Sequence, residues 1–414
     1  MDPTKPNSPF GRASPRETRW GVVVVVVLAA AVAAFQVGKV PVALPLLRHD
    51  LGLSLFGAAL VVAVLSAVAT LVAIVVGTAS DALGARRLSL LALGTIAGAS
   101  LAGAFADGVA WLLLTRIFEG LGVIVLFAAG PAMILRAVSE RHTRLAFAAW
   151  GSYMPLGLAA MVLLSPLLLA PLGWRGLWIV NAALAAVFAA VYLLGTRATP
   201  DPPGGAATRH LGRDLGAVLG ARGPWLLALA FAAYGTHYLC VIAFLPTYLG
   251  EQHGLGAAAA AAIVGLAIAA NVPGNLAAGW LLHRGASRRR LLSLAVLVMA
   301  ASSVLIFQPG TPLPALVFLT TAFSGIGGLV PASLFSAVPA YAPSPALVGA
   351  TSGLILQCVN MGQLAGPPIF AAVVSAWSWA RAPWMFAALA LAGLILAQLI
   401  GREEARALPE KFIK

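Results

Sequence analysis

Three ionisable side chains lie inside long apolar stretches of the sequence, where an unpaired charge is costly. They are Lys39, Arg116 and Glu119. Near the centre of a bilayer such a group costs roughly 2.5–3.5 kcal/mol, so each is a functional candidate. Arg116 and Glu119 are three residues apart, so on a helix they share a face and can pair. The pair either neutralises two charges structurally, or Glu119 is a proton-coupling carboxylate beside a substrate-responsive Arg116.

Lys39 and His237 have two interpretations each. Lys39 either attracts an anionic substrate from a cavity or extends its amine towards the outer headgroups. His237 is flanked by Tyr238 and corresponds to Gln36 in an internal repeat described below. Since histidine titrates near neutral pH, a cavity role for His237 is attractive. The alternative is a histidine that is merely hydrogen-bonded between helices.

Uncharged polar residues in apolar stretches can orient a substrate by hydrogen bonding. Tyr153, Asn271 and Asn360 are candidates, and Asn271 and Asn360 lie nearest the predicted midplane. Such residues also join helices, for about 0.6 kcal/mol each. The complete predicted cavity set is Gln36, Lys39, Arg116, Tyr153, His237, Tyr238, Asn271 and Asn360.

The sequence contains no pattern typical of catalysis. There is no phosphate-binding loop, and the two cysteines, Cys240 and Cys358, lie in apolar segments without metal-ligand spacing. We therefore expect no enzymatic activity, no cofactor and no bound metal.

The composition indicates whether these side chains belong to a water-soluble protein or to a membrane protein. Of the 414 residues, 61% are hydrophobic and 9% are charged, against about 25% charged in soluble domains. This excludes a soluble enzyme and a disordered chain. The net charge of +13 is not gathered on a soluble domain, so nucleic-acid binding is not expected. An all-α membrane protein embedded in the lipid bilayer remains.

Twelve apolar stretches are long enough to cross a bilayer, which takes about 20 residues each. Alternation with period two is absent, so the spans are helices rather than barrel strands. The predicted spans are 20–47, 54–77, 88–105, 109–136, 144–170, 174–196, 224–249, 257–282, 290–308, 313–340, 346–374 and 383–400.

Positive charges give the orientation. Most of the 26 lysines and arginines fall in segments on one side of the twelve spans, whereas the other side holds Arg48, Arg175 and Arg381. Because basic loops stay in the cytoplasm, both termini are predicted to be cytoplasmic, in the inner (plasma) membrane.

The two halves of the sequence match at an offset of about 201 residues. Ala43-Leu44-Pro45 corresponds to Phe244-Leu245-Pro246, and Pro166 corresponds to Pro367. Repeats of this kind are typical of transporters, with the substrate site between the halves. The predicted domains are a cytoplasmic tail at 1–19, six-helix bundles at 20–196 and 223–400 with pseudo-two-fold symmetry, a cytoplasmic linker at 197–222 and a cytoplasmic tail at 401–414.

A loop motif points to a family. The segment after the second span reads GTASDALGARR (77–87). It resembles the signature of the major facilitator superfamily between its second and third helices, with one extra residue before the arginines. In that family this loop is a conformational latch, which implies this role for Gly77, Asp81, Gly84, Arg86 and Arg87.

Further segments carry the resemblance. LLLTRIFEGLG (112–122) resembles the fourth-helix motif of the superfamily, with Glu119 where glutamine is usual. The second copy of the loop, GWLLHRGASRRR (279–290), has His283 where the aspartate would stand, so a symmetric latch is in question. LVGATSGLILQCVNMGQLAGPP (347–368) resembles the cyanate-porter-like branch, which implies small anions or small polar compounds as substrates.

These observations predict a secondary transporter that works by alternating access. The preferred function is proton-coupled uptake of a small anion, cyanate-like or a small carboxylate, because the predicted cavity holds more cations than anions. The alternative is a proton-driven drug or metabolite efflux antiporter. A membrane sensor would need a soluble signalling domain. The expected partners are a small-molecule substrate and a proton, and the chain is expected to be monomeric.

Overall fold

The computed structural model describes residues 17–201 and 211–407, and every regular element within them is a helix. Residues 1–16, 202–210 and 408–414 lie outside this part. Most of the predicted N-terminal tail, part of the predicted linker and part of the predicted C-terminal tail are therefore not described. The first half contains α1 (Trp20–Asp50), α2 (Leu55–Leu83), α3 (Ala85–Ala104), α4 (Val109–Ala137), η1 (Glu140–His142), α5 (Thr143–Gly151) and α6 (Tyr153–Gly195). The remainder contains α7 (Leu211–Gly220), α8 (Arg222–His253), α9 (Ala257–His283), α10 (Arg288–Ile306), α11 (Leu313–Gly327), α12 (Leu329–Phe335), α13 (Val338–Tyr341), η2 (Pro345–Leu347), α14 (Val348–Ala376), η3 (Ala382–Trp384) and α15 (Met385–Ala407).

Eleven segments of the described chain are long and apolar enough to cross a membrane. One of them, Glu140–Gly195, has 56 residues and includes the 43-residue α6. At about 1.5 Å per residue, α6 would be twice as long as the roughly 30 Å core of a bilayer. Its backbone leaves the helical region at Gly173 (φ 63°), beside Pro171, and the chain turns back there. Counting this segment as two gives the twelve predicted crossings.

Two details of the linker and tail differ from the sequence prediction. The predicted linker includes α7, a helix of ten residues whose Val218 is buried. Leu211, Leu215 and Val218 have the spacing of one helical face, a pattern that could have revealed it. The last crossing, α15, continues to Ala407, so the predicted tail at 401–414 begins inside a helix.

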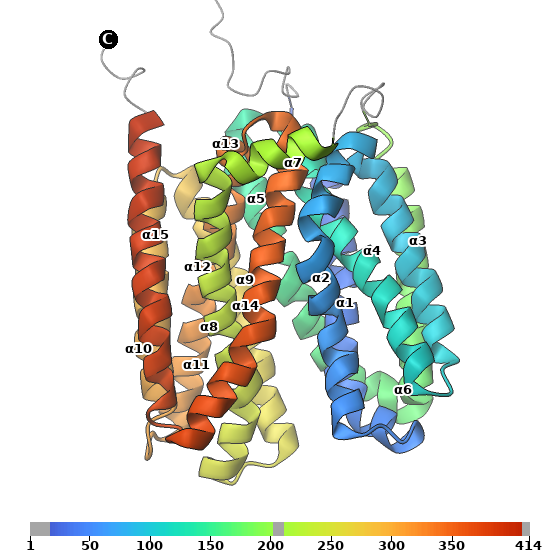
Figure 1. The fold of residues 1–414 in the computed structure, drawn as a ribbon, viewed down its shortest axis with the longest axis vertical. Helices are drawn as coiled ribbons and strands as arrows, with labels where there is room; N and C mark the ends of the chain where they lie inside the picture. Colours follow the sequence, from blue (N-terminus) through green and yellow to red (C-terminus); the bar gives the residue numbers. More distant parts are fainter. Residues whose placement is uncertain (1–16, 202–210, 408–414) are drawn as a thin grey trace, which may run out of the picture.

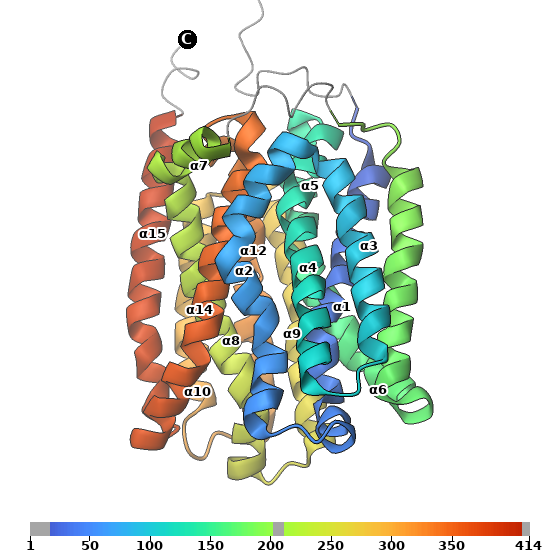
Figure 2. The same ribbon diagram turned by 45° about the vertical axis from the view of Figure 1, so that its right-hand side comes forward.

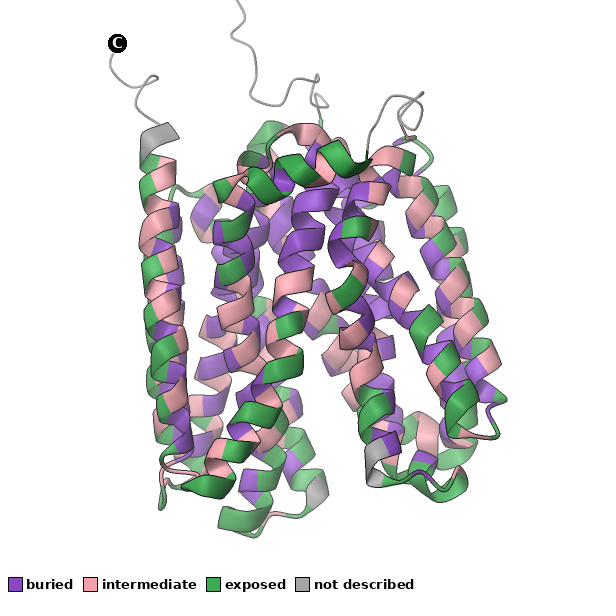
Figure 3. Cartoon of the chain, in the orientation of Figure 1, coloured by how far each residue is buried: buried purple, intermediate pink, exposed green. Residues whose placement is uncertain are grey.

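The two groups of helices meet most closely at one end of the molecule. In Figures 1 and 2, α2 and α14 lie side by side near the end where α15 finishes and diverge towards the other end. Figure 3 shows buried residues concentrated where the halves meet near that first end. The second close contact joins α5 to α9 and α12. In the internal repeat, span 2 corresponds to span 8 and span 5 corresponds to span 11. The contact of α2 with α14 is therefore related by the pseudo-symmetry to the contact of α9 with α5.

Candidate functional site

The three charged residues predicted inside spans form one buried cluster. The Lys39 ammonium donates to Glu119 Oε1 at 2.6 Å, and Arg116 Nη1 donates to Glu119 Oε2 at 2.5 Å. All three side chains are at most 1% exposed. The predicted Arg116–Glu119 pair is therefore present. Lys39 from α1 also joins it, which the sequence did not indicate.

Two further residues hold Lys39 in place. Its ammonium donates to the Ser100 hydroxyl at 2.8 Å and lies 4.4 Å from the centre of a Trp178 ring. Ser100 in turn donates to the Trp178 carbonyl at 3.1 Å. These contacts bring together α1, α3, α4 and α6. The amine of Lys39 thus points into the first half of the protein and does not extend to the headgroups.

The cluster has an excess positive charge when all three groups are ionised. One carboxylate faces two cations, and none of the three reaches solvent. Removing one partner from a buried ion pair leaves an uncompensated charge at a cost of about 3–5 kcal/mol. Any event that neutralises Glu119 would therefore force Lys39 and Arg116 to find other partners. This property makes the cluster suitable for linking protonation to helix movement.

His237 lies in a separate cluster in the second half. Its Nε2 is 3.0 Å from the Ser303 hydroxyl, and its ring stacks on Phe386 with centroids 4.2 Å apart. Phe323 meets the same ring edge-on at 5.4 Å. His237 is 4% exposed and packs inside its own bundle, among α8, α10, α11 and α15.

Tyr238 and Asn271 belong to a small hydrogen-bond network beside it. The Tyr238 and Ser324 hydroxyls are 3.0 Å apart, and the Asn271 amide donates to the Ser324 carbonyl at 2.8 Å. The same amide lies 3.3 Å from the Tyr234 hydroxyl, and Asn275 donates to Asn271 Oδ1 at 2.8 Å. This network ties α8 and α9 to α11 within the second half.

The other predicted cavity residues are held locally. Gln36 donates weakly to Asn181 at 3.4 Å, and Asn360 donates to the Leu356 carbonyl of its own helix. The Tyr153 ring packs against those of Phe127 and Trp150, each with centroids 4.5 Å away. The predicted cavity set thus divides between the two halves, and in this conformation its charged members and His237 are buried within one half or the other. Their role in substrate binding stays a prediction.

Two of the predicted latch residues, Gly77 and Asp81, lie where the two halves meet. The Asp81 carboxylate accepts from the backbone amides of Gly349 at 3.1 Å and Ala350 at 2.8 Å. These amides belong to the first turn of α14, where free N–H groups and the helix dipole favour an anion. A side chain at Gly77 would collide with the Gly349 carbonyl, and one at Gly353 with the Ala73 carbonyl. The absence of side chains therefore allows α2 and α14 to touch backbone to backbone.

The other predicted latch residues make their contacts within the first half and with Asp201. Gly84 has a φ of 103°, which favours glycine, and the Asp201 carboxylate packs against it. Asp201 accepts from the backbone amides of Arg86 and Arg87, each at 3.0 Å, at the start of α3. It also pairs with Arg136 at 2.9 Å. Asp201 lies in the predicted linker, and no motif in the sequence indicates these contacts.

At the second contact between the halves, the charged side chain is a cation rather than a carboxylate. Arg144 of α5 donates to the Leu282 carbonyl at 2.7 Å, in the last turn of α9. A cation is favourable at the C-terminal end of a helix. His283, which replaces the expected aspartate, stacks instead on His142. The two contacts are therefore asymmetric: a carboxylate meets a helix N-terminus in one, and a guanidinium meets a helix C-terminus in the other.

Comparison with known proteins supplies a family match. A sequence model of the Major Facilitator Superfamily matches residues 26–355. The human organic anion transporter MFSD10 (TETRAN) has a similar structure, with a TM-score of 0.79 over 93% of this chain and 100% of that one, at 19% sequence identity. At that identity the likeness shows the fold alone.

Two resistance proteins match parts of the chain. The methyl viologen resistance protein SmvA of Salmonella typhimurium is 29% identical over 171 residues, which is 41% of this chain and 34% of that protein. The puromycin resistance protein pur8 of Streptomyces alboniger is 31% identical over 221 residues, which is 53% of this chain and 42% of that protein. The matches thus span less than half the length of either relative.

Proposed function

Because the chain belongs to the Major Facilitator Superfamily and is a multi-pass membrane transporter, we propose that it exports small toxic organic compounds in exchange for protons. The observation that carries this proposal is the similarity to two resistance proteins. It favours the efflux alternative over the small-anion uptake that the sequence predicted. The identity of the exported compounds is also proposed, because the matches cover less than half of each relative.

The orientation belongs to the same proposal. We place the protein in the inner membrane as a monomer, with both termini in the cytoplasm, as the basic loops predict. The end closed by Asp81 and Arg144 is then the cytoplasmic end. In this conformation the exporter faces outwards, ready to release its cargo and take up a proton.

The cluster of Lys39, Arg116 and Glu119 is the proposed coupling site. A proton that binds Glu119 would neutralise the carboxylate that contacts both buried cations. The resulting repulsion would drive α1 away from α4, because Lys39 and Arg116 lie on these two helices. Loss of the proton would restore both contacts. Protonation and the relative position of these helices are thereby coupled.

Anion uptake remains a second candidate, favoured by one specific observation. The buried cluster carries more positive than negative charge, and a small anion that approached it would offset the excess. The comparisons do not support the predicted resemblance to the cyanate-porter-like branch, because the relatives that match are resistance proteins, so this candidate rests on the charge of the cluster. The competing proposals predict different cargo, so transport assays separate them.

The export proposal is tested by drug susceptibility. Expression of the chain in a bacterial strain that lacks its own exporters is expected to raise the inhibitory concentration of methyl viologen or puromycin. In protein that still reaches the membrane in amounts matched to the wild type, Glu119→Gln is expected to abolish this protection. Asp107→Asn, which changes an exposed carboxylate between α3 and α4, is the matched control and should protect as the wild type does.

Proteoliposomes with an imposed pH gradient separate the two candidates. If the chain reaches the membrane but protects against neither compound, and labelled cyanate accumulates in the vesicles, anion uptake replaces export. If Glu119→Gln protects fully, the assignment of proton coupling to this cluster is wrong.

A further inference from the structure

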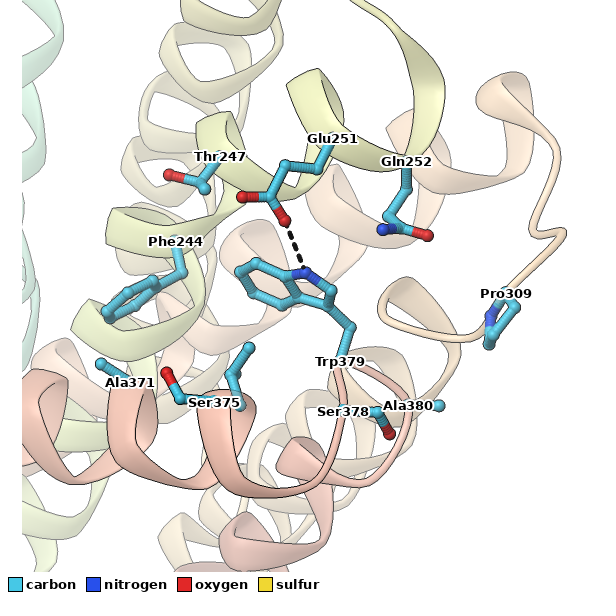
Figure 4. Close-up of a pocket in the computed structure, with 11 residues that line it drawn as sticks. Phe244, Thr247, Glu251, Gln252, Pro309, Ala371, Ser375, Ser378, Trp379 and Ala380 are labelled. Atoms are coloured by element: carbon cyan, nitrogen blue, oxygen red, sulfur yellow. Dashed lines mark hydrogen bonds between the residues drawn. The ribbon is translucent and has the colours of Figure 1, made fainter.

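A pocket of about 600 Å³ lies in the second half of the protein, at the end away from the Asp81 contact. Its volume falls in the range of roughly 300–1,000 Å³ that is typical of sites for small molecules. The end of α8 provides Phe244, Thr247 and Glu251, and the end of α14 with the following loop provides Ser375 and Trp379. Figure 4 shows Glu251 and Trp379 reaching towards each other from these two segments.

The indole of Trp379 is held in a fixed orientation. Its Nε1 donates to Glu251 Oε2 at 2.9 Å, and its ring stacks on Phe307 at 9° with centroids 5.7 Å apart. Tyr248 meets it edge-on at 5.4 Å. Phe307 and Tyr248 are both buried, so they form a rigid support. The aromatic ring and the carboxylate are thus positioned before any ligand arrives.

The one charged side chain that lines the pocket is a carboxylate, although the whole chain is strongly basic. Glu251 is the one acidic residue among the described residues that line it, and none of those residues is basic. In addition, α8 ends at His253 and α14 ends at Ala376, each one residue beyond a residue that lines the pocket. The C-terminal end of a helix carries partial negative charge. Two helix ends and a carboxylate therefore act in the same direction.

We propose that this pocket binds organic cations that carry a flat aromatic group, as an outer release site for exported compounds. The carboxylate would offset the positive charge, and the Trp379 ring would stack against the aromatic group or lie beneath the cation. The hydroxyls of Thr247 and Ser375 offer further polar contacts. This inference rests on the proposed export function and adds to it a site and a class of cargo.

Binding of methyl viologen to the purified full-length protein tests the site. Isothermal titration calorimetry is expected to show that Glu251→Gln raises the Kd about tenfold, the effect of one lost charge contact near a surface. Asp107→Asn, which changes an exposed carboxylate at the same end, should leave the Kd unchanged. Uncharged 4,4′-bipyridine should not distinguish Glu251→Gln from the wild type.

The aromatic part of the site is tested by a pair of variants. Trp379→Leu is expected to abolish detectable binding, whereas Trp379→Phe, which keeps a flat ring, should retain most of it. Melting temperatures close to that of the wild type would show that both variants are folded.

Two results overturn the proposal in distinguishable ways. If Glu251→Gln binds and exports methyl viologen as the wild type does, the pocket is not a cation site, while the export function stands. If the wild type neither binds nor exports methyl viologen or puromycin, the proposed function fails, and the pocket proposal fails with it.

Discussion

Replacing Glu119 by glutamine is expected to destabilise the protein much more than replacing Lys39 by methionine. In the folded chain both cations contact the same carboxylate, at 2.6 Å and 2.5 Å, and all three groups are buried. Glu119→Gln leaves Lys39 and Arg116 without a counter-charge. Lys39→Met leaves a neutral Arg116–Glu119 pair and places an apolar chain of similar length beside Trp178.

The magnitudes follow from these contacts. Breaking a buried pair costs about 3–5 kcal/mol, and Glu119→Gln breaks two contacts that share one carboxylate. Lys39→Met loses hydrogen bonds to Glu119 and Ser100 but also removes a buried charge, so its net cost is about 0–2 kcal/mol. The double variant retains one uncompensated cation and should lie between the two single variants.

The assay is thermal unfolding of the purified proteins in one detergent. The expected order of melting temperature is wild type, Lys39→Met, the double variant and then Glu119→Gln. A double-mutant cycle would show strong coupling, because the second change relieves part of the damage of the first. The reasoning would be refuted by a Lys39→Met protein that melts at or below Glu119→Gln, or by strictly additive effects.

Further predictions concern the contact between α2 and α14. Asp81→Asn should weaken this contact by about 1–2 kcal/mol, because a charged acceptor at a helix N-terminus becomes neutral. Spin labels on α2 and α14 should then report a larger fraction of molecules in which the two helices are apart. An unchanged distance distribution would contradict the role of Asp81. Gly353→Val should abolish transport while the protein still inserts, because its side chain collides with the backbone of α2. The control is Gly94→Val in α3, where a Cβ meets no neighbour within 4 Å, and full transport by Gly353→Val would be the contrary result.

Much of the fold could be predicted from the sequence, because lipid restricts what an apolar segment can do. Each predicted crossing has a helix in the structure, including the turn at Gly173 that separates two crossings. The helix α7 is harder to predict, because its apolar face is short and lies in a linker rich in charged residues and proline. The cytoplasmic side of the termini rests on loop charges and stays a prediction.

The candidate site was less predictable, since its contacts join distant parts of the chain. Arg116 and Glu119 are neighbours on one helix, so their pairing followed from spacing. The approach of Lys39 depends on how deep α1 lies against α4, which no local pattern encodes. The same holds for Glu251 and Trp379, which are 128 residues apart. The excess of cations in the spans predicts an anionic cargo, but in the structure Lys39 and Arg116 both contact Glu119.

The contact of glycine against backbone between α2 and α14 has a consequence for how the protein moves. Dispersion forces between closely fitted surfaces lose a quarter to a half of their strength when a gap of only about 0.5–1 Å opens. Gly77 and Gly353 carry no flexible side chains that could stretch to bridge such a gap. A small separation of α2 from α14 is therefore expected to lose much of their packing energy at once, which favours a two-state change between contact and separation over a gradual one.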